Sequence, residues 1–419
     1  MVRMTAMRNW ARFALCAALA TLASCAPARL SMPPAGRVEV PFELVESSPL
    51  ETRLRHPQLA QAKDVWWTMI QRSAVSLDFA EFYASNAPGS ALKRIIEAIE
   101  SAAERGVRVR FLSEEKFYKT YPETLDRLAA HRGVEVRRYP TAKLSGGVMH
   151  AKYFIVDGKE AFLGSQNFDW RSLEHIQELG ARVAIPAVVG ALSDVYETDW
   201  ALAGGASRDA RVQAHRGQDR FPATVPFDGE TLGITPVFSP KGWLPDESLW
   251  DLPQLVAAID AAQRTVRVQL LTYRAESKNG PPFTELDSAL RRAAGRGVAV
   301  QLLVSHWSKR KDLIQELQRL HSPPNLQVKL ITIPPWSGGF IPFARVAHAK
   351  YLVIDGERGW IGTSNWERDY FERSRNVGLL LESKRIGSEL DRFFLDGWDS
   401  SYAELVDPAA RYEEPKIGP

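Results

Sequence analysis

The sequence predicts an α/β protein made of two similar α/β sandwich modules, each with a mixed sheet flanked by helices, packed as a pseudo-twofold pair. Three observations support this prediction: the composition, an internal repeat, and apolar strand-like runs that alternate with helical stretches. The 419 residues are 45% hydrophobic and 25% charged, which is a globular composition, and the chain is long enough for one large domain or two ordinary ones.

The internal repeat pairs the segment 150–167 with the segment 348–365, 198 residues further along the chain. Both segments contain His-x-Lys-x4-Asp followed by Gly-[Ser/Thr]-x-Asn. Upstream, an Arg-Gly-Val turn at 105–107 recurs at 296–298 with an offset of only 191 residues. The second copy therefore contains seven extra residues before its His, and we expect them in the Pro- and Gly-rich segment 334–342.

Each copy is predicted to run strand, helix, strand, helix and then a hairpin of two short strands joined by an Asp-Gly turn. The predicted elements are strands 75–83 and 266–273, helices 90–104 and 284–295, strands 107–112 and 298–304, helices 121–131 and 313–320, and hairpin strands 153–156, 161–163, 351–354 and 359–361.

The chain is divided by these patterns into six expected parts. They are a lipoprotein-type signal peptide (1–24), a lipidated Cys and tether (25–45), the first module (46–203), a linker (204–231), the second module (232–405) and a C-terminal tail (406–419).

The N-terminus has the pattern of an export signal. Three Arg precede an acid-free apolar run, 13–22, that has the length of a signal-peptide core and is too short for a membrane span. Leu-Ala-Ser-Cys25 resembles the bacterial lipobox, in which the Cys becomes the acylated first residue. We therefore expect a lipid-anchored protein of the bacterial cell envelope, facing the periplasm from the outer membrane if the cell is Gram-negative. The alternative is an ordinary signal peptide with an incidental Cys.

Export restricts what the mature chain contains. Cys16 and Cys25 are the only cysteines, so the folded part is expected to have no disulfide and to depend on core packing. Removal of residues 1–24 takes away three Arg and no acidic residue, so the formal net charge falls from +3 to zero. A balanced surface argues against a broad basic field for duplex nucleic acid and leaves room for local basic patches.

The repeated motifs supply the groups that phosphodiester chemistry needs. Residues two apart on a strand share a face, so His150 points the same way as Lys152, and His348 the same way as Lys350. Two modules that meet about a pseudo-twofold axis would enclose both pairs in one pocket. Lys would neutralise phosphate oxygens, Asn and Ser/Thr would donate hydrogen bonds to them, one His would attack and the other would transfer protons. The supporting polar residues are Ser165, Asn167, Glu178, Thr363, Asn365 and Asn376.

These motifs resemble those of the phospholipase D superfamily, and the resemblance covers almost the whole mature chain. Segments 167–173, 341–346 and 362–366 are similar to the branch that contains the animal lysosomal phospholipase D3 and D4 proteins and a poxvirus nicking-joining enzyme. The resemblance implies a covalent phosphohistidine intermediate, two displacement steps and no metal or other cofactor. For the branch it implies 5′-to-3′ exonuclease action on single-stranded DNA or RNA. The sequence itself contains no zinc-type cluster.

Roles within the motifs follow from one difference between the copies: Glu178 corresponds to Asn376. A carboxylate beside Nδ1 would raise the basicity of Nε2, so we place Glu178 beside His150 and expect that His to be the nucleophile and His348 the general acid. The usual role of the first-motif His in the family points the same way. The sequence does not show which carboxylate faces which His.

Asp157 and Asp355 belong to the motif by resemblance. They lie at the hairpin turns, so strand parity does not place them on the catalytic face, and we expect orienting roles for them. The alternative is that Asp-Gly is simply the turn pair.

Three function classes compete. The first is an exonuclease on single-stranded nucleic acid, and the second is a phospholipase D or transphosphatidylase, including cardiolipin-synthase-like exchange, that a lipid anchor would hold at its substrate. The third, a noncatalytic binding protein, is disfavoured because no motif position is lost.

Overall fold

The computed structural model describes residues 40–208, 220–275, 282–320 and 324–419. The predicted signal peptide, Cys25 and most of the tether lie outside these residues, as do His215 and His321. Within the described ranges, no helix is long and apolar enough to cross a membrane.

The first half contains an eight-stranded mixed sheet ordered β2-β1-β10-β8-β7-β3-β5-β6. Its strands are β1 (Phe42–Ser47), β2 (Ala60–Gln61), β3 (Ser76–Glu81), β5 (Arg108–Glu114), β6 (Val134–Tyr139), β7 (Lys152–Val156), β8 (Glu160–Gly164) and β10 (Glu178–Val183). A separate two-stranded sheet pairs β4 (Ala84–Ser85) with β9 (Phe168–Asp169). The helices are α1 (Ala62–Arg72), α2 (Ala91–Glu104), α3 (Glu115–Tyr118), α4 (Glu123–Ala130), α5 (Thr141–Leu144), α6 (Trp170–Glu174) and α7 (Pro186–Ala203).

The second half repeats this plan in a nine-stranded sheet ordered β11-β12-β18-β17-β16-β13-β14-β15-β19. Its strands are β11 (Ala223–Phe227), β12 (Glu230–Ser239), β13 (Thr265–Leu270), β14 (Ala299–Ser305), β15 (Leu326–Ile331), β16 (Tyr351–Ile354), β17 (Arg358–Gly362), β18 (Asn376–Glu382) and β19 (Ala403–Leu405). Its helices are α8 (Asp251–Asp260), α9 (Glu285–Gly295), α10 (Lys311–Leu320), α11 (Arg368–Glu372) and α12 (Lys384–Trp398), with 3-10 turns η2 (Glu247–Leu249) and η3 (His306–Lys309).

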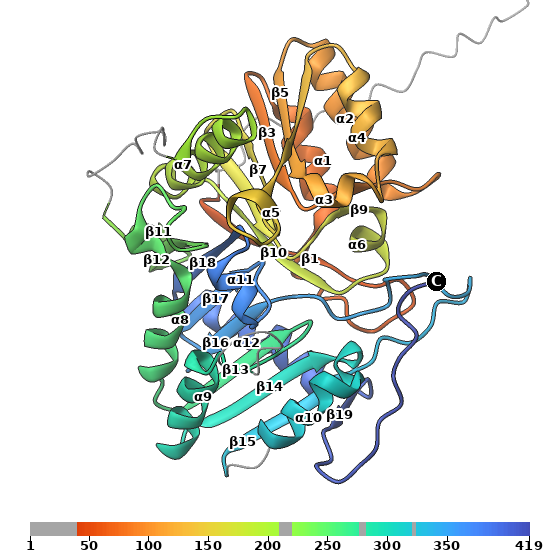
Figure 1. Cartoon of the computed structure of the whole chain (residues 1–419). Helices are drawn as coiled ribbons and strands as arrows, with labels where there is room; N and C mark the ends of the chain where they lie inside the picture. Colours follow the sequence, from red (N-terminus) through yellow and green to blue (C-terminus); the bar gives the residue numbers. More distant parts are fainter. Residues whose placement is uncertain (1–39, 209–219, 276–281, 321–323) are drawn as a thin grey trace, which may run out of the picture. The chain divides into compact units, whose positions relative to one another are not determined.

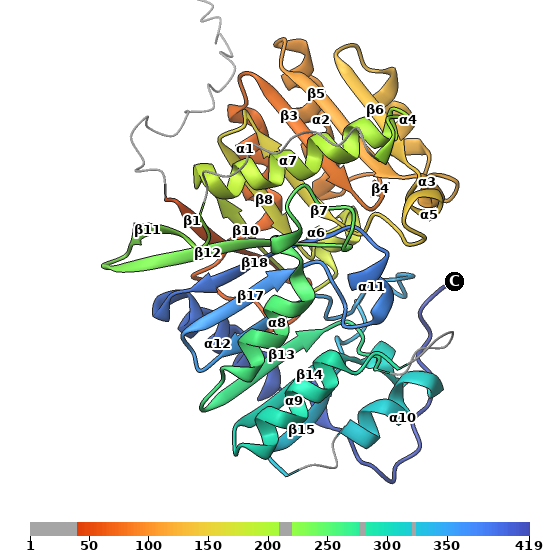
Figure 2. The same ribbon diagram turned by 60° about the vertical axis from the view of Figure 1, so that its left-hand side comes forward.

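The predicted α/β class with two similar modules is thus confirmed, and Figures 1 and 2 show the two halves as successive stretches of the colour ramp. The module bounds differ from the prediction. β1 begins at Phe42 inside the expected tether, and β11 lies inside the expected linker 204–231, where it pairs with β12 as the edge of the second sheet. The longer connection of the second copy lies between β15 and His348, as the Pro-rich segment indicated.

Three large apolar clusters hold this arrangement together. One lies between the first sheet and α1 with α2, and one lies between the second sheet and α8 with α9. The third contains α7, α12 and the opposite faces of both sheets, so it is shared by the two halves. Because this core is continuous, the halves are packed as one body, with β10 and β18 at their junction.

A buried ion pair crosses the same junction. The guanidinium of Arg375 contacts both oxygens of Asp199, with Nε–Oδ2 at 2.8 Å and Nη2–Oδ1 at 2.9 Å. Arg375 also donates to the backbone carbonyls of Ser239 and Trp243, and Tyr139 donates to Asp199. Arg375 therefore joins the halves and is not available to steer a substrate.

Replacement of Asp199 by Ala is expected to lower the free energy of unfolding by about 3–5 kcal/mol, because Arg375 would stay buried without its counter-charge. Urea denaturation measures this loss. The matched control is Glu97→Ala, which removes the exposed Lys93–Glu97 pair of α2 and is expected to cost less than about 1 kcal/mol. Equal effects for the two variants would contradict the structural role of Arg375.

Candidate active site

The two motif histidines lie immediately before β7 and β16, and the backbone of each is held by the other half. The amide of His150 donates to the carbonyl of Arg375 at 2.8 Å, and the amide of His348 donates to the carbonyl of Gln177 at 2.8 Å. Parallel bridges, Met149 with Arg375 and Gln177 with Ala347, extend these contacts. Arg375 directly precedes β18, and Gln177 directly precedes β10. Each histidine is therefore positioned by the residue that leads into a strand of the opposite half.

The side chains cross the junction in the same way, which corrects the sequence-based pairing. Nδ1 of His348 lies 2.8 and 2.9 Å from the two carboxylate oxygens of Glu178, and Nδ1 of His150 lies 3.1 Å from Oδ1 of Asn376. The expected Glu178–His150 contact is wrong. Glu178 and Asn376 are the first residues of β10 and β18, and those strands start beside the histidine of the other half, so each orienting group reaches across the junction.

The hydroxyls of the Gly-[Ser/Thr]-x-Asn motifs support these orienting groups. Ser165 accepts from the amide of Leu179 at 3.0 Å, and Thr363 donates to Oδ1 of Asn376 at 2.9 Å. Ser165 and Thr363 are fully buried and neither lines the cavity, so the expectation that they donate to phosphate oxygens is wrong. They act one layer behind, on the residues that fix the imidazoles.

The orientation of Asn376 determines the tautomer of His150. Its amide nitrogen donates to the carbonyls of Tyr370 at 2.7 Å and Ser374 at 3.3 Å, which leaves Oδ1 facing the imidazole. An amide oxygen only accepts, so Nδ1 of His150 carries the hydrogen and Nε2 is turned away from Asn376.

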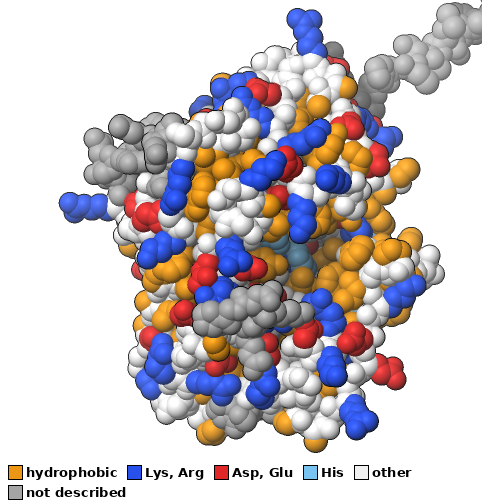
Figure 3. Space-filling view, viewed as in Figure 1, with side chains coloured by type: hydrophobic (Ala, Val, Ile, Leu, Met, Phe, Trp, Pro, Cys, Tyr) orange, Lys and Arg blue, Asp and Glu red, His pale blue; other side chains and the backbone are white. Residues whose placement is uncertain are grey.

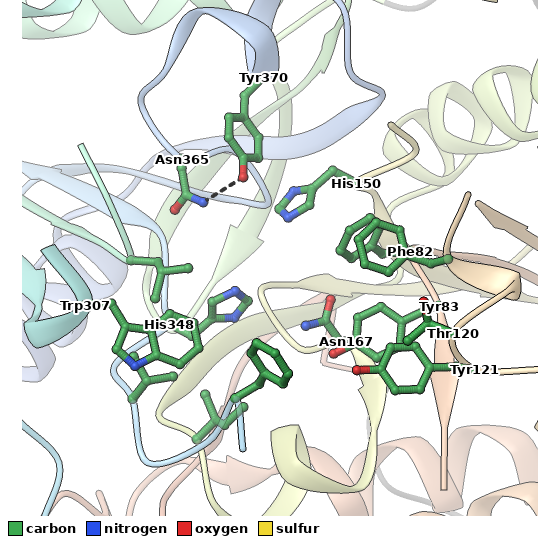
Figure 4. A pocket seen from close by; sticks show the side chains of 15 residues that line it. Phe82, Tyr83, Thr120, Tyr121, His150, Asn167, Trp307, His348, Asn365 and Tyr370 are labelled. Carbon is green, nitrogen blue, oxygen red and sulfur yellow. Dashed lines mark hydrogen bonds between the residues drawn. The ribbon is translucent and has the colours of Figure 1, made fainter. Parts of the chain in front are cut away.

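Both histidines open into one cavity of about 340 Å³. In Figure 4, His150 and His348 face each other across it, with Asn365 on one side of the pair and Asn167 on the other. The lining residues are Phe82, Tyr83, Phe117, Thr120, Tyr121, His150, Asn167, Ile176, Leu271, Trp307, Phe343, Val346, His348, Asn365 and Tyr370. The surface view shows a histidine side chain at the bottom of a hollow bordered by hydrophobic side chains (Figure 3). The single shared pocket predicted from the repeat is therefore present.

Two buried ammonium groups lie behind the histidines. Lys152 donates to the carbonyl of His150 at 2.5 Å and Lys350 donates to the carbonyl of His348 at 2.6 Å. Burial lowers the pKa of both lysines, that of Lys350 to about 7. Burial, reinforced by the two lysines, also lowers the pKa of both histidines well below the ordinary value. A phosphodiester anion in the cavity would favour the protonated, cationic forms of these lysines and histidines.

Two buried carboxyl groups lie beside these lysines: Glu178 beside both, and Glu81 beside Lys152. Burial raises the pKa of Glu178 to about 8, opposed by Lys350, by hydrogen bonds from Ser165 and Ser172, and by Lys152. In the described part of the chain, no cluster of three His, Cys, Asp or Glu residues could hold a metal ion.

Asp157 and Asp355 are outside the cavity lining, as strand parity indicated, and the groups that they orient are backbone amides. Each sits in a left-handed conformation at the hairpin turn, with φ of 54° and 57°. The carboxylate of Asp157 accepts from the amides of residues 74–76, and that of Asp355 from the amides of residues 263–265. These bonds lower the pKa of both carboxyls against the opposing effect of burial. Each Asp therefore fixes the start of β3 or β13 to the hairpin.

Sequence reasoning missed the aromatic part of the cavity. Tyr370 lies edge-on to the His150 ring at 4.8 Å and accepts a hydrogen bond from Asn365 at 3.2 Å. Phe82 contacts the same imidazole at 5.0 Å. Among the aromatic residues in or near the motif segments, Trp307 lines the cavity, whereas Tyr153 and Trp366 are buried in the core. The signal that could have found Phe82 was its place directly after a catalytic-sheet strand.

Comparisons with known proteins agree with this geometry. The family model described as "Cardiolipin synthase, PLD-like domain" matches twice, at residues 67–200 and 255–398. The chain belongs to the phospholipase D superfamily. It is 30% identical to phospholipase D Z of Dictyostelium discoideum over 86% of this chain and 90% of the relative. It is also 30% identical to the 5′-3′ exonuclease PLD3 of Bos taurus over 85% of this chain and 77% of the relative.

Solved structures support the superfamily fold. Phosphatidylserine synthase of Haemophilus influenzae aligns with a TM-score of 0.60 at 11% identity, covering 82% of this chain and 85% of that one. Polyphosphate kinase of Porphyromonas gingivalis aligns with a TM-score of 0.55 at 13% identity, covering 90% of this chain and 51% of that one. As a phospholipase D superfamily member, the protein is an enzyme, a phosphodiesterase.

Replacement of Asp157 by Ala in this phosphodiesterase is expected to destabilise the fold without removing activity. Three backbone amides at the start of β3 would lose a charged acceptor, which should cost about 1–3 kcal/mol in the free energy of unfolding. Turnover of a chromogenic phosphodiester by the folded variant should stay within several-fold of wild type. A loss of turnover by about a hundredfold or more in protein shown to be folded would restore Asp157 to the catalytic set.

Proposed function

We propose that the protein is a 5′ exonuclease on single-stranded DNA or RNA that works through a covalent phosphohistidine. The observation that carries the proposal is the cavity itself, in which two differently oriented histidines face each other beside two buried lysines. Similarity to the 5′-3′ exonucleases PLD3 and PLD4 over most of the chain favours nucleic acid as the substrate.

The contact between Glu178 and His348 makes His348 the proposed nucleophile. The sequence-based choice of His150 depended on Glu178 lying beside it, and that premise does not hold. As the P–N bond forms at Nε2, positive charge develops on the imidazole. This charge opposes the effect of burial and favours the ionised form of Glu178 at Nδ1, which in turn stabilises the imidazole. The amide oxygen of Asn376 orients His150 but supplies no full charge, which suits a proton donor.

The proposed reaction has two displacements. In the first, Nε2 of His348 bonds to phosphorus, the bond from phosphorus to the leaving oxygen breaks, and His150 gives that oxygen its proton. In the second, neutral His150 takes a proton from water, whose oxygen bonds to phosphorus as the P–N bond breaks. Asn167 and Asn365 line the cavity and face the phosphate in both steps, and Lys152 and Lys350 act on it electrostatically from behind the histidines. A bound phosphate monoanion raises the pKa of His150, which helps it to hold the proton for the first step.

A second candidate is phospholipase D or transphosphatidylase action on membrane phospholipids. Phe340 and Phe343 are the specific observation that favours it, because both are large apolar side chains that are 52% and 43% exposed, and Phe343 lines the cavity. Under the same proposal, residues 1–25 export the protein and attach it to the envelope membrane through Cys25, so either substrate would be met outside the cytoplasm.

Side-by-side assays of one preparation discriminate the two functions. The wild type is expected to release mononucleotides from single-stranded oligonucleotides with a free 5′ end, in the presence of EDTA, and to leave phospholipid vesicles unchanged. His150→Ala should reduce the rate by about 10²- to 10⁴-fold, the usual contribution of a general acid. The matched control is His131→Ala, a histidine outside the cavity lining, which should keep full activity. Headgroup release from vesicles without nucleotide release would reject the exonuclease.

A further inference from the structure

One side of the cavity carries an aromatic wall formed by Phe82, Tyr83, Phe117 and Tyr121. All four are half-buried and line the cavity. Tyr83 stacks on Tyr121 with ring centroids 4.8 Å apart, and Phe82 contacts Phe117 at 4.2 Å. In Figure 4, the labelled wall residues gather on the side opposite Trp307. The wall is a continuous ring surface that faces the reacting centre.

The wall is held in place before any substrate arrives. The hydroxyl of Tyr83 donates to Asp169 at 2.7 Å, and Asp169 is paired with Arg171 at 2.6 Å. Arg171 also donates to the hydroxyl of Tyr121 at 3.5 Å. Asp169 and Arg171 are both buried. Their ion pair, hydrogen-bonded at its two ends to the hydroxyls of Tyr83 and Tyr121, fixes the two tyrosine rings. A rigid aromatic surface loses little conformational entropy when a ligand stacks on it.

In the described part of the second half, the positions that match Phe82 and Tyr83 are not aromatic, although the supporting contact is kept. Ala80 pairs with Tyr153 in the first sheet, and Gln269 pairs with Tyr351, the repeat equivalent of Tyr153, in the second. Phe82 and Tyr83 therefore correspond to Leu271 and Thr272. Thr272 donates to Glu367 at 2.6 Å, as Tyr83 donates to Asp169. The hydroxyl of a Thr is therefore enough to make this contact with the carboxylate. The phenol ring of Tyr83 is an additional feature of the His150 side of the cavity.

From this asymmetry we infer that the aromatic wall is the subsite for the nucleobase on the leaving side of the scissile phosphate. The inference rests on the proposed exonuclease function and on His150 as the general acid. In an in-line displacement the leaving oxygen lies opposite the attacking nitrogen and next to the acid. Phe82 touches the His150 ring at 5.0 Å, so the leaving nucleoside extends over the wall. A nucleobase presents the flat π-face that such rings stack on, and an acyl chain or an alcohol headgroup does not.

The charges beside the wall fit a strand that continues past it. Lys116 and Lys119 flank Phe117 in the sequence and are exposed, and the exposed Arg138 lies over the Tyr118 ring at 3.4 Å. Figure 3 shows Lys and Arg side chains on the surface above the hollow. These cations can neutralise the phosphates of the following nucleotides.

The test compares three short single strands. One strand is complete, one lacks the base of the first nucleotide on the leaving side of the scissile phosphate, and one lacks the base of the 5′-terminal nucleotide. For the wild type, removal of the leaving-side base should lower kcat/KM by about 5- to 150-fold, the range that stacking supplies. Removal of the terminal base should have a smaller effect.

Variants locate this preference on the wall. Phe117→Leu combined with Tyr121→Leu keeps apolar side chains but removes two rings. The ratio of kcat/KM on the complete strand to kcat/KM on the leaving-side abasic strand should then approach one. Tyr121→Phe should keep the ratio. Trp307→Leu is the matched control on the opposite side of the cavity and should also keep it.

The outcomes separate the inference from the proposed function. Equal cleavage of the complete and leaving-side abasic strands, or a preference that survives the double Leu variant, overturns the inference and leaves the exonuclease intact. Cleavage of vesicle phospholipid with none of any strand overturns both.

Discussion

The contact between Glu178 and His348 is the interaction on which the site depends. It joins a carboxylate from the first half to a histidine from the second, and Asn376 and His150 make the reverse connection. Neither half alone holds an oriented imidazole. The two sheets therefore have to pack in one register before any chemistry is possible, and the shared apolar core that contains α7 and α12 fixes that register.

The cost of this arrangement is a concentration of buried charge. Lys152, Lys350 and Glu178 are all almost completely inaccessible, and an isolated buried ion is strongly unfavourable. The two lysines lie beside two buried carboxyls, Glu178 and Glu81, and a bound anion would favour the charged forms of the lysines and histidines. The Asp199–Arg375 pair at the same junction differs, because its two opposite charges contact each other directly. The remaining hydrogen bonds of the guanidinium go to backbone carbonyls.

Much of this architecture could be predicted from the repeat. The spacing of 150–167 and 348–365 correctly predicted one shared pocket, and strand parity correctly placed His150 beside Lys152. The crossed pairing could not be predicted, because Glu178 and His348 are 170 residues apart and no local pattern relates them. Orienting roles were expected for Asp157 and Asp355, but their amide partners could not be predicted, because a motif records which residues recur and not what they contact. The aromatic wall was missed because it occurs in one copy only.

The central claim is that Glu178, by reaching across the junction, makes His348 the nucleophile and leaves His150 as the acid and base. The most direct measurement uses a labelled phosphodiester whose leaving group needs no proton, with His150→Ala and His348→Ala as matched variants, followed by a rapid quench and mapping of covalent phosphate. His150→Ala should still form the P–N bond and, without a base to activate water, accumulate phosphohistidine at residue 348. His348→Ala should form none. Phosphohistidine at residue 150 in the His348→Ala variant would contradict the account.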